Sequence, residues 1–289
     1  DVSPAISDQS LSVAENTSNG TSVGTVSLDA GDDNSITFSI DAGNTGNAFA
    51  IDSSSGEITV NDTTATDFEA APTFGLTVSV DGFIDGTFNA KTDFTAGDTP
   101  FSVVLGDVNG DGFDDIVTAN GISDNVSVLT GNGDGTFNAK TDFTAGNFPD
   151  SVVLGDVNGD GIADIVTANR NSDNVSVLTG KGDGTFNAKT DFAAGDRPYS
   201  VVLGDVNGDG IDDIVTANRI SDNVSVLTGK GDGTFNAKTD FAAGDRPYSV
   251  VLGDVNGDGI DDIVTANLDS GNVSVLTGNG DGTFNAKTD

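Results

Sequence analysis

The 289-residue chain contains no cysteine, histidine, methionine or tryptophan. The absence of histidine and cysteine excludes serine or cysteine catalysis with a histidine base, and it excludes nearly all zinc sites. The lack of tryptophan removes a strong surface for stacking on sugar rings. The lack of cysteine permits an oxidising compartment without proving one. Long hydrophobic runs are also missing, since none approaches the ~20 residues of a membrane span, so we expect no membrane insertion.

Basic residues are scarce, because 11 lysines and arginines face 46 acidic residues and leave a formal net charge of −35. Such a chain repels nucleic acid and anionic lipid and attracts divalent cations. Only Glu15, Glu57 and Glu69 are glutamate. Aspartate, with its short side chain, suits turns and compact sets of oxygen ligands. A salt-adapted acidic surface explains the total charge, but neither the aspartate bias nor its spacing.

Residues 1–82 do not repeat, and short runs there alternate apolar and polar residues. No window has a helical period. Short runs separated by Gly, Asn, Asp and Ser predict a β-sandwich, which we expect to form a separate domain. Length alone suggests about two domains. Residue 1 is aspartate with no signal peptide before it, so we expect a mature chain or an excised segment. The predicted strands are residues 11–13, 23–28, 36–40, 49–51, 57–60 and 76–80.

From residue 85 the chain is periodic. The run Asp-Gly-Thr-Phe-Asn-Ala-Lys-Thr-Asp begins at residues 85, 134, 183, 232 and 281, a period of 49. A period in this range with only β signals predicts the blades of a β-propeller. The predicted all-β chain thus has a sandwich at 1–82 and propeller repeats at 83–289. The repeat units are 85–133, 134–182, 183–231 and 232–280, with a partial unit at 281–289.

Each 49-residue period holds four strand candidates. Counted from residue 101 they are 101–106, 115–119, 125–130 and 137–143, the last of which lies at the start of the unit 134–182. The first strand is nearly all apolar, so we expect it to be buried on both faces. The third and fourth alternate more, as outer strands do. Four strands per unit match one propeller blade.

The run Gly-Asp-Val-Asn-Gly-Asp-Gly occurs four times, beginning at residues 106, 155, 204 and 253, and opens a nine-residue loop after the first strand. Positions 1, 3, 5 and 9 carry side-chain oxygens, position 7 offers a backbone carbonyl, and glycines at positions 4 and 6 permit positive φ. Calcium takes about six to eight oxygens, and without a cation the carboxylates would repel one another by roughly a few kcal/mol per pair. The predicted calcium ligands are Asp107, Asn109, Asp111, Phe113 and Asp115; Asp156, Asn158, Asp160, Ile162 and Asp164; Asp205, Asn207, Asp209, Ile211 and Asp213; and Asp254, Asn256, Asp258, Ile260 and Asp262.

The loop differs from an EF-hand, which has glutamate at position 12, where the first copy has Thr118, and a helix where this chain has strand-forming residues. A β-turn rich in Asn-Gly and Asp-Gly is the simpler interpretation. That interpretation does not explain the acid at position 9, which lies beyond any turn. Calcium binding is therefore the favoured hypothesis.

The units resemble FG-GAP/VCBS-type repeats, the blades of the integrin α-chain propeller and of many bacterial surface proteins. In that family the loop D-x-[DN]-x-D-G-x-x-D between the first two strands binds calcium, and the resemblance covers residues 85–289. The family usually closes seven blades, whereas this chain has four whole units. The fourth-strand sequence appears both at 85–93 and at 281–289, so we expect a piece of a longer array or an open, curved stack.

The first domain resembles a cadherin-like domain of bacterial adhesins. The resemblance rests on Val13–Asn16, Phe49–Asp52, Ser55–Ile58 and Asp67–Glu69. The family's D-x-N-D-N linker is absent, and solvated loop acids are the alternative to a calcium site here. The weaker calcium candidates that the resemblance implies are Glu15, Asp67 and Glu69.

The four units differ mainly in the turn before the first strand and in the turn between the second and third strands. In an up-and-down blade these two turns share one end, opposite the calcium-type loop. Both tyrosines and all four arginines lie in them, and these residue types are typical interface anchors. We therefore expect an extracellular protein or glycan ligand at this end, with neutral drift as the alternative. The candidate partner residues are Phe101, Phe148, Arg170, Arg197, Tyr199, Arg219, Arg246 and Tyr248.

These observations predict a secreted or cell-surface adhesion or interaction module in which calcium makes the blades rigid. Extracellular modules bind calcium at about 0.1–1 mM, far above cytosolic levels. We expect no enzymatic activity. The alternatives are a glycan-binding, lectin-like propeller, a passive structural segment of a large surface protein, and a carboxylate-based glycosidase. The last is disfavoured because the repeats contain no glutamate.

Overall fold

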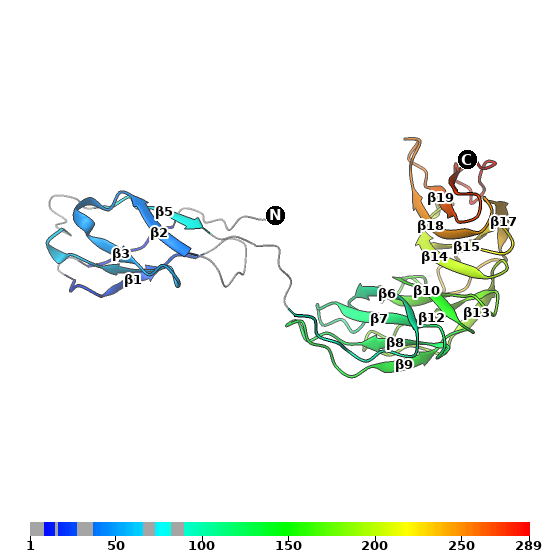
Figure 1. Ribbon diagram of the computed structural model, residues 1–289, viewed down its shortest axis with the longest axis horizontal. Helices are drawn as coiled ribbons and strands as arrows, with labels where there is room; N and C mark the ends of the chain where they lie inside the picture. Colours follow the sequence, from blue (N-terminus) through cyan, green and yellow to red (C-terminus); the bar gives the residue numbers. More distant parts are fainter. Residues whose placement is uncertain (1–8, 15–16, 28–36, 66–72, 82–89) are drawn as a thin grey trace. The chain divides into compact units, whose positions relative to one another are not determined.

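A computed structural model describes residues 9–14, 17–27, 37–65, 73–81 and 90–289. It is an all-β structure, as the sequence predicts, whose helical content is two short 3-10 turns within these residues, η1 (Thr45–Asn47) and η2 (Thr63–Ala65). The chain divides into two compact units, residues 1–92 and 93–289, each of which is described by itself (Figure 1).

The first unit contains two antiparallel sheets around a small core. One sheet has the spatial order β1 (Ser22–Thr25), β4 (Glu57–Val60) and β3 (Phe49–Ile51), and the other pairs β2 (Thr37–Ala42) with β5 (Thr77–Asp81). Apolar side chains that alternate along these strands supply the core, as the period-two pattern predicts. The buried core residues are Ala48, Phe49, Ile58 and Val60.

The strand predicted at 11–13 is wrong, because these residues form no ladder in the structure. Instead, Gln9 holds the neighbouring segment by donating to the Ser27 carbonyl (2.6 Å) and accepting the Ser27 N–H (3.0 Å). Leu11 lies directly over Gly24, where an added Cβ would be 2.7 Å from Leu11 Cδ2. The apolar residue of this run is therefore used in packing over a glycine and not in strand pairing.

The second unit consists of four sheets, one per sequence repeat, which we call blades 1 to 4. Within each blade the strands run antiparallel in chain order, and we call them strands A to D. Blade 1 is β6 (Pro100–Gly106), β7 (Asp115–Asn120), β8 (Asn125–Leu129) and β9 (Thr141–Thr144); blade 2 is β10 (Pro149–Gly155), β11 (Asp164–Asn169), β12 (Asn174–Leu178) and β13 (Thr190–Ala193); blade 3 is β14 (Pro198–Gly204), β15 (Asp213–Asn218), β16 (Asn223–Leu227) and β17 (Thr239–Ala242); and blade 4 is β18 (Pro247–Gly253), β19 (Asp262–Asn267) and β20 (Asn272–Leu276), with Thr288 bridged to Val275.

Strand B, and not the more apolar strand A, is the strand buried on both faces. All six residues of β11 are buried, whereas most of β10 is half-buried. Strand B can carry polar residues because each has a partner: Asn169 donates to Ser176 Oγ (2.8 Å), which in turn donates to Asp191 (2.6 Å). Satisfied polar groups remove the usual cost of burial, so hydropathy alone selects the wrong strand.

Strand D is shorter than the predicted 137–143. In blade 1 it begins at Thr141, and Phe137 contributes an isolated bridge to Gly131. The intervening turn is fixed by Asp134, whose carboxylate accepts the Thr136 N–H at 2.9 Å. This local side-chain bond competes with the ladder and delays its start.

Successive blades pack face to face through three separate apolar clusters. Each cluster joins a trailing face of one blade, such as Val157, Val166 and Val175, to a leading face of the next, such as Val201 and Ile214. In Figure 1 the blades follow one another along an arc, with β6 at one end and β19 at the other. The outer faces of blades 1 and 4 stay exposed, since Val103 is 64% and Val255 57% accessible. The arrangement is the open, curved stack.

Candidate functional site

Each predicted calcium loop is folded around the aspartate at its first position. Asp107 accepts the Gly110 N–H at Oδ1 (2.7 Å) and the Gly112 N–H at Oδ2 (2.8 Å). Both glycines have positive φ, 77° and 87°, a conformation that side chains with a Cβ resist. Asp156, Asp205 and Asp254 make the same two bonds at 2.6–2.8 Å.

The aspartate at position 9 is fully buried and fixes the loop to the turn after strand C. Asp115 has 0% exposure and accepts the N–H groups of Val108 (2.9 Å) and Gly131 (2.8 Å). This pairing explains an acid at a place that no β-turn requires. Asp164, Asp213 and Asp262 repeat it at 2.7–3.2 Å.

Positions 3, 5 and 7 form the outer part of the loop. Asn109 Oδ1 accepts the Asp111 N–H (2.8 Å), and Asp111 Oδ1 accepts the Phe113 N–H (2.9 Å). The position-5 carboxylates are exposed in all four loops. The same bonds hold Asn158, Asp160 and Ile162, then Asn207, Asp209 and Ile211, and then Asn256, Asp258 and Ile260.

The donor chemistry of these loops fits a hard cation, because the predicted ligands are all oxygens. Their present arrangement is one of self-closure: in the described part of the chain, no three acidic side chains converge on one point. The reason is visible in the bonds above, since backbone N–H groups occupy the oxygens at positions 1 and 9. The loops therefore bring the right residues together, and the carboxylates would have to turn from these N–H groups toward an ion.

Electrostatics separates the two kinds of aspartate. Backbone N–H groups, that of Gly112 foremost, hold the pKa of Asp107 below its ordinary value. Burial raises the pKa of Asp213 to about 6, partly opposed by its two N–H donors and reinforced by Asp209 and Asp205. Burial likewise raises the pKa of Asp164, with Asp160 and Asp156 as its acidic neighbours. The acids of one loop are thus close enough to disfavour each other's charge.

One acidic residue of the predicted calcium loops, at position 8, was not identified from the sequence. Burial raises the pKa of Asp212, at position 8, and the next causes are Asp205 of its own loop and Asp156 of the preceding blade. Its Oδ2 lies 3.3 Å from where a Cβ on Gly155 would be. Position 8 is aspartate in three loops and Ala163 in the other, a pattern that could have drawn attention to it. The weaker candidates Glu15, Asp67 and Glu69 lie outside the described residues.

The two variable turns lie against each other at the opposite end of each blade, as the sequence predicts. Arg170 N–H donates to the Phe148 carbonyl (3.0 Å), and the Asn171 N–H to that of Asn147 (3.1 Å). Phe148 has φ of 58°, unusual for an aromatic residue before proline. Its N–H is held by Asp124 Oδ1 at 2.8 Å. Arg197 and Arg246 occupy the equivalent left-handed position.

Much of the predicted partner face is packed against itself between blades. The Phe101 and Phe148 rings are 5.4 Å apart, and the Arg170 guanidinium lies 3.7 Å from the centre of Phe148. Arg170 and Arg219 both donate to the Tyr199 hydroxyl, at 2.9 and 2.8 Å. Stacked cations on aromatic faces stabilise contacts where water is excluded. These side chains join neighbouring blades, a role that the sequence pattern does not distinguish from ligand binding.

Asp150 is enclosed by this stack. Its side chain is 6% exposed and forms an ion pair with Arg170 Nε at 3.3 Å. Burial raises the pKa of Asp150 to about 6, against the opposing effects of Arg170 and Arg219. Within the described part of the chain, neither its buried carboxylate oxygen Oδ2 nor the buried Arg219 Nε has a hydrogen-bond partner. Burial of Asp150 therefore disfavours its ionised form relative to its protonated form.

Other members of the face remain available to solvent. Phe101 is 52% and Tyr248 50% exposed, Arg197 is exposed, and Arg246 forms a surface ion pair with Asp269 at 3.0 Å. Three apolar residues at the same end were not singled out from the sequence. They are Ile122, Ile220 and Leu268, which are 62%, 45% and 57% exposed.

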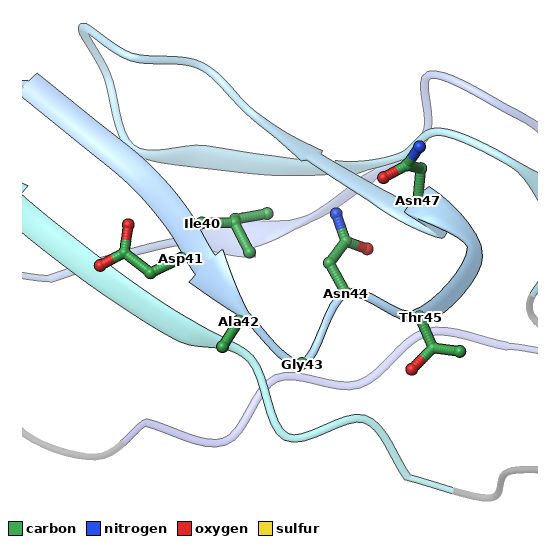
Figure 2. A pocket seen from close by; sticks show the side chains of 7 residues that line it. All are labelled: Ile40, Asp41, Ala42, Gly43, Asn44, Thr45 and Asn47. Atoms are coloured by element: carbon green, nitrogen blue, oxygen red, sulfur yellow. The ribbon is translucent and has the colours of Figure 1, made fainter.

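A shallow hollow in the first unit lies where β2 ends. Figure 2 shows Asp41 on the strand and Asn44, Thr45 and Asn47 on the turn that follows. Asn44 is committed to the backbone, because it accepts the Phe49 N–H (2.9 Å) and donates to the Phe49 carbonyl (2.7 Å). The hollow is therefore the surface of a turn that the Asn44 side chain stabilises.

Among the described residues, no helix has the length and apolar character to cross a membrane. The sequence profile of the FG-GAP-like repeat matches residues 107–167, 156–216 and 205–265, and that of the cadherin domain matches residues 9–85. Both domain types are typical of extracellular proteins. A search of curated proteins found no match.

Three solved structures are among those that this chain matches. BBS1N, in a crystal with ARL6DN soaked with mercury, is 13% identical with a TM-score of 0.46, covering 68% of this chain and 56% of its own. The V. cholerae biofilm matrix protein Bap1 is 14% identical with a TM-score of 0.43, covering 100% and 43%. A Lactobacillus plantarum protein is 15% identical with a TM-score of 0.48, covering 88% and 67%. The chain thus spans about half of the first two structures.

Proposed function

Because the chain belongs to the FG-GAP-like repeat family and carries an N-terminal cadherin domain, we propose that it is a calcium-binding extracellular adhesion or interaction module. The observation that carries the proposal is the fourfold loop in which acids at positions 1 and 9 are drawn inward and linked to the strand framework. An ion held there would connect the loop after strand A to the start of strand B. Its contribution would be charge neutralisation and rigidity.

In this proposal, the side chains at positions 1, 3, 5 and 9 and the backbone at position 7 hold the ion. Asp107, Asn109, Asp111 and Asp115 are those side chains in blade 1. The backbone N–H bonds that they now accept give up part of their geometry to the cation. Binding at about 0.1–1 mM, the range of extracellular modules, suits a site that must first release such bonds.

Calorimetric titration of the calcium-stripped chain with CaCl2 tests this. We expect one saturable site per loop, and loss of one site in the double variant Asp205→Asn with Asp209→Asn. The matched control is Asp196→Asn, an exposed aspartate at the opposite end of the blade, which should keep every site. Unchanged stoichiometry in the double variant would remove the basis of the proposal.

We place partner binding at the end with the variable turns. Support comes from the exposed Phe101, Arg197 and Tyr248 and from the neighbouring Ile122 and Leu268, since aromatic, arginine and apolar groups together are typical of interfaces. A protein partner is favoured over a glycan, because the faces of Phe148 and Tyr199 are covered by guanidinium groups. No covalent chemistry is proposed at this end.

Beads coated with the chain, tested on protein-coated and glycan-coated surfaces, separate these readings. We expect retention on a protein surface that falls with Arg197→Ala and Tyr248→Ala combined. Lys181→Ala and Lys230→Ala, in the turns after strand C, are the controls and should retain binding. Retention confined to glycans would favour the lectin-like alternative, and equal retention of all variants would exclude this face.

A further inference from the structure

The turn between strands C and D of one blade, which we call the C–D turn, lies against the calcium-type loop of the preceding blade. In blade 2 the Gly184 N–H donates to the carbonyl of Val108, at position 2 of the blade 1 loop, at 3.1 Å. A Cβ added at Gly184 would lie 3.6 Å from Asn109 Cβ. A Cβ added at Gly110 would lie 3.7 Å from the Gly182 carbonyl oxygen. The C–D turn therefore covers positions 2 to 4 of that loop.

The same C–D turn is held by the loop of its own blade. Asp164, the fully buried acid at position 9, accepts the Gly180 N–H at the start of the turn at 2.7 Å. The turn is closed on itself, because the Lys181 N–H donates to the Thr185 carbonyl at 3.0 Å. A displacement at Gly180 is therefore transmitted to Gly184, since hydrogen-bonded rigid segments carry coupling between sites.

The connection continues to the position-9 acid of the preceding loop. Val108 is 1% exposed, and while its carbonyl accepts the Gly184 N–H, its own N–H donates to Asp115 at 2.9 Å. Hydrogen bonds and one closed turn thus join Asp164 of blade 2 to Asp115 of blade 1. Gly184 is buried, so water does not compete for the bond that crosses the interface.

The same path recurs at the other two interfaces between blades, with hydrogen bonds of 2.8–3.2 Å, so the four position-9 acids are connected in series. Each step lies between two neighbouring blades of the stack. The residues that form the path there are Asp213, Gly229, Gly233, Val157 and Asp164, and then Asp262, Gly278, Gly282, Val206 and Asp213.

We propose that the C–D turn couples the loops, so that an ion bound in one loop raises the affinity of the loop in the preceding blade. This inference rests on the proposed function, because the ion is the calcium held by these acids. Backbone N–H groups now occupy the acids at positions 1 and 9, and a cation requires release of part of that bonding. Because two loops share one turn, its rearrangement serves both, and the first ion lowers the free energy that the second must supply.

Charge acts in the opposite direction. Asp212 Oδ2 of blade 3 lies 3.3 Å from where a Cβ on Gly155 would be, and Gly155 directly precedes Asp156 of the blade 2 loop. Acids of adjacent loops therefore attract the same cations, and a first ion weakens the attraction for a second. Salt screens this effect, whereas it leaves the hydrogen bonds through the turn in place. Cooperativity between loops should therefore increase with added sodium chloride.

A tryptophan reporter tests the coupling, because the chain has no tryptophan of its own. Phe113, at position 7 of the blade 1 loop, is 48% exposed, and Phe113→Trp in the full chain gives a fluorescence signal from that loop alone. The reporter chain is titrated with CaCl2 at about 0.15 M salt. In this background, Asp156→Asn with Asp160→Asn disables the blade 2 loop. We expect the reporter affinity to fall by at least about fivefold, the lower end of typical coupling.

The role of the turn is tested by Gly184→Ala, which leaves every predicted ligand in place. The added Cβ would lie 3.2 Å from Thr130 Cγ2, in the contact between turn and loop. The reporter affinity should fall toward that of the chain with the disabled blade 2 loop, and combining the changes should add little further loss. Lys181→Ala, exposed on the same turn, is the matched control and should keep the full affinity.

The outcomes separate the coupling from calcium binding itself. The same calcium midpoint in all variants would mean that the loops bind independently, which overturns the coupling and leaves the proposed function standing. Absence of binding in both fluorescence and calorimetry would overturn the proposed function and the coupling with it. A control disables the distant blade 4 loop with Asp254→Asn and Asp258→Asn. An equal shift in that control would indicate a general effect of charge and would exclude transmission through the turn.

Discussion

At the residue scale, aspartate has several separate uses in each blade, and its abundance does not reduce to one of them. At position 9 it accepts two backbone N–H groups while fully buried. Elsewhere, as at Asp124, it holds the N–H of a left-handed residue in the next turn. Short acceptor side chains fit such local backbone bonding. Bonds of this kind at the first and ninth positions hold each loop in shape.

Asp150 gives a prediction about pH. Its pKa is raised to about 6 by burial, above the unfolded value of about 3.9, so the folded state favours the protonated acid. Its contribution to stability is therefore most favourable at low pH and declines as pH rises from about 4 to 6. A shift of two units corresponds to about 2–3 kcal/mol.

The measurement is urea unfolding of the repeat unit from pH 4 to pH 7, for the natural chain and Asp150→Asn. Since asparagine does not titrate, the variant should gain stability relative to the natural chain as pH rises, and the comparison cancels the other acids. A relative loss would mean that the ion pair with Arg170 outweighs burial. Asp196→Asn is the exposed control.

At the element scale, glycines at the end of strand A determine how closely blades approach. Gly155 ends β10 and is covered by Leu203 of the next blade, while Gly253 ends β18 with open space around it. Both positions lie in the same run, Ser-Val-Val-Leu-Gly-Asp-Val-Asn-Gly-Asp-Gly-Ile, and they differ in what packs on them. They form a matched pair within one chain.

We expect Gly155→Ala to destabilise the repeat unit by about 1–3 kcal/mol, because its Cβ would be 2.6 Å from Leu203 Cδ1 and close packing must be disturbed. Gly253→Ala should change stability by less than about 0.5 kcal/mol, as a surface substitution does. Thermal melting of the two variants under conditions where the chain is monomeric provides the comparison. Equal effects would mean that the observed packing of Leu203 does not limit blade spacing.

At the scale of the whole molecule, the second unit, residues 93–289, is a linear stack in which each blade contacts its neighbours. In such arrays stability is close to a sum of unit and interface terms. The acidic loops recur in every blade, so their mutual repulsion accumulates along the stack. A bound cation at each loop would offset it four times.

Chelation should therefore lower the melting temperature strongly. At tenfold excess over its dissociation constant, one ion contributes about 1.4 kcal/mol, so four give about 6 kcal/mol. With about 2–4 °C per kcal/mol for a unit of this size, the expected fall is roughly 12–24 °C. Scanning calorimetry with calcium and with a chelator measures it. Sodium chloride at matched ionic strength is the control, because screening alone also relieves repulsion; an equal rise with that salt would remove the ion-specific effect.

The periodic sequence was sufficient to predict the architecture. A 49-residue period, four β runs per unit and turn residues between them lead to antiparallel four-stranded blades, and strand C was placed to within one residue at 125–129. The alternating pattern of the first domain likewise predicted a β-sandwich, with strands such as 49–51 and 57–60 in place. These features are local, so hydropathy, spacing and turn chemistry encode them.

The tertiary structure decided what each repeated residue contacts. The sequence favoured strand A as the buried strand, but strand B is buried because hydrogen-bond partners on the neighbouring strand, such as Ser176 for Asn169, satisfy its polar groups. The sequence predicted that the arginines and tyrosines form one exposed face. In the structure Arg170 and Tyr199 pack between blades, whereas Tyr248 does not. Leu105 and Leu203 occupy the same position in two different repeats, and the preceding blade makes Leu203 partly buried while Leu105 is 59% exposed. Composition and period determine the structure of a single blade. Burial of its side chains depends on the neighbouring blades, because packing is an interaction between two surfaces.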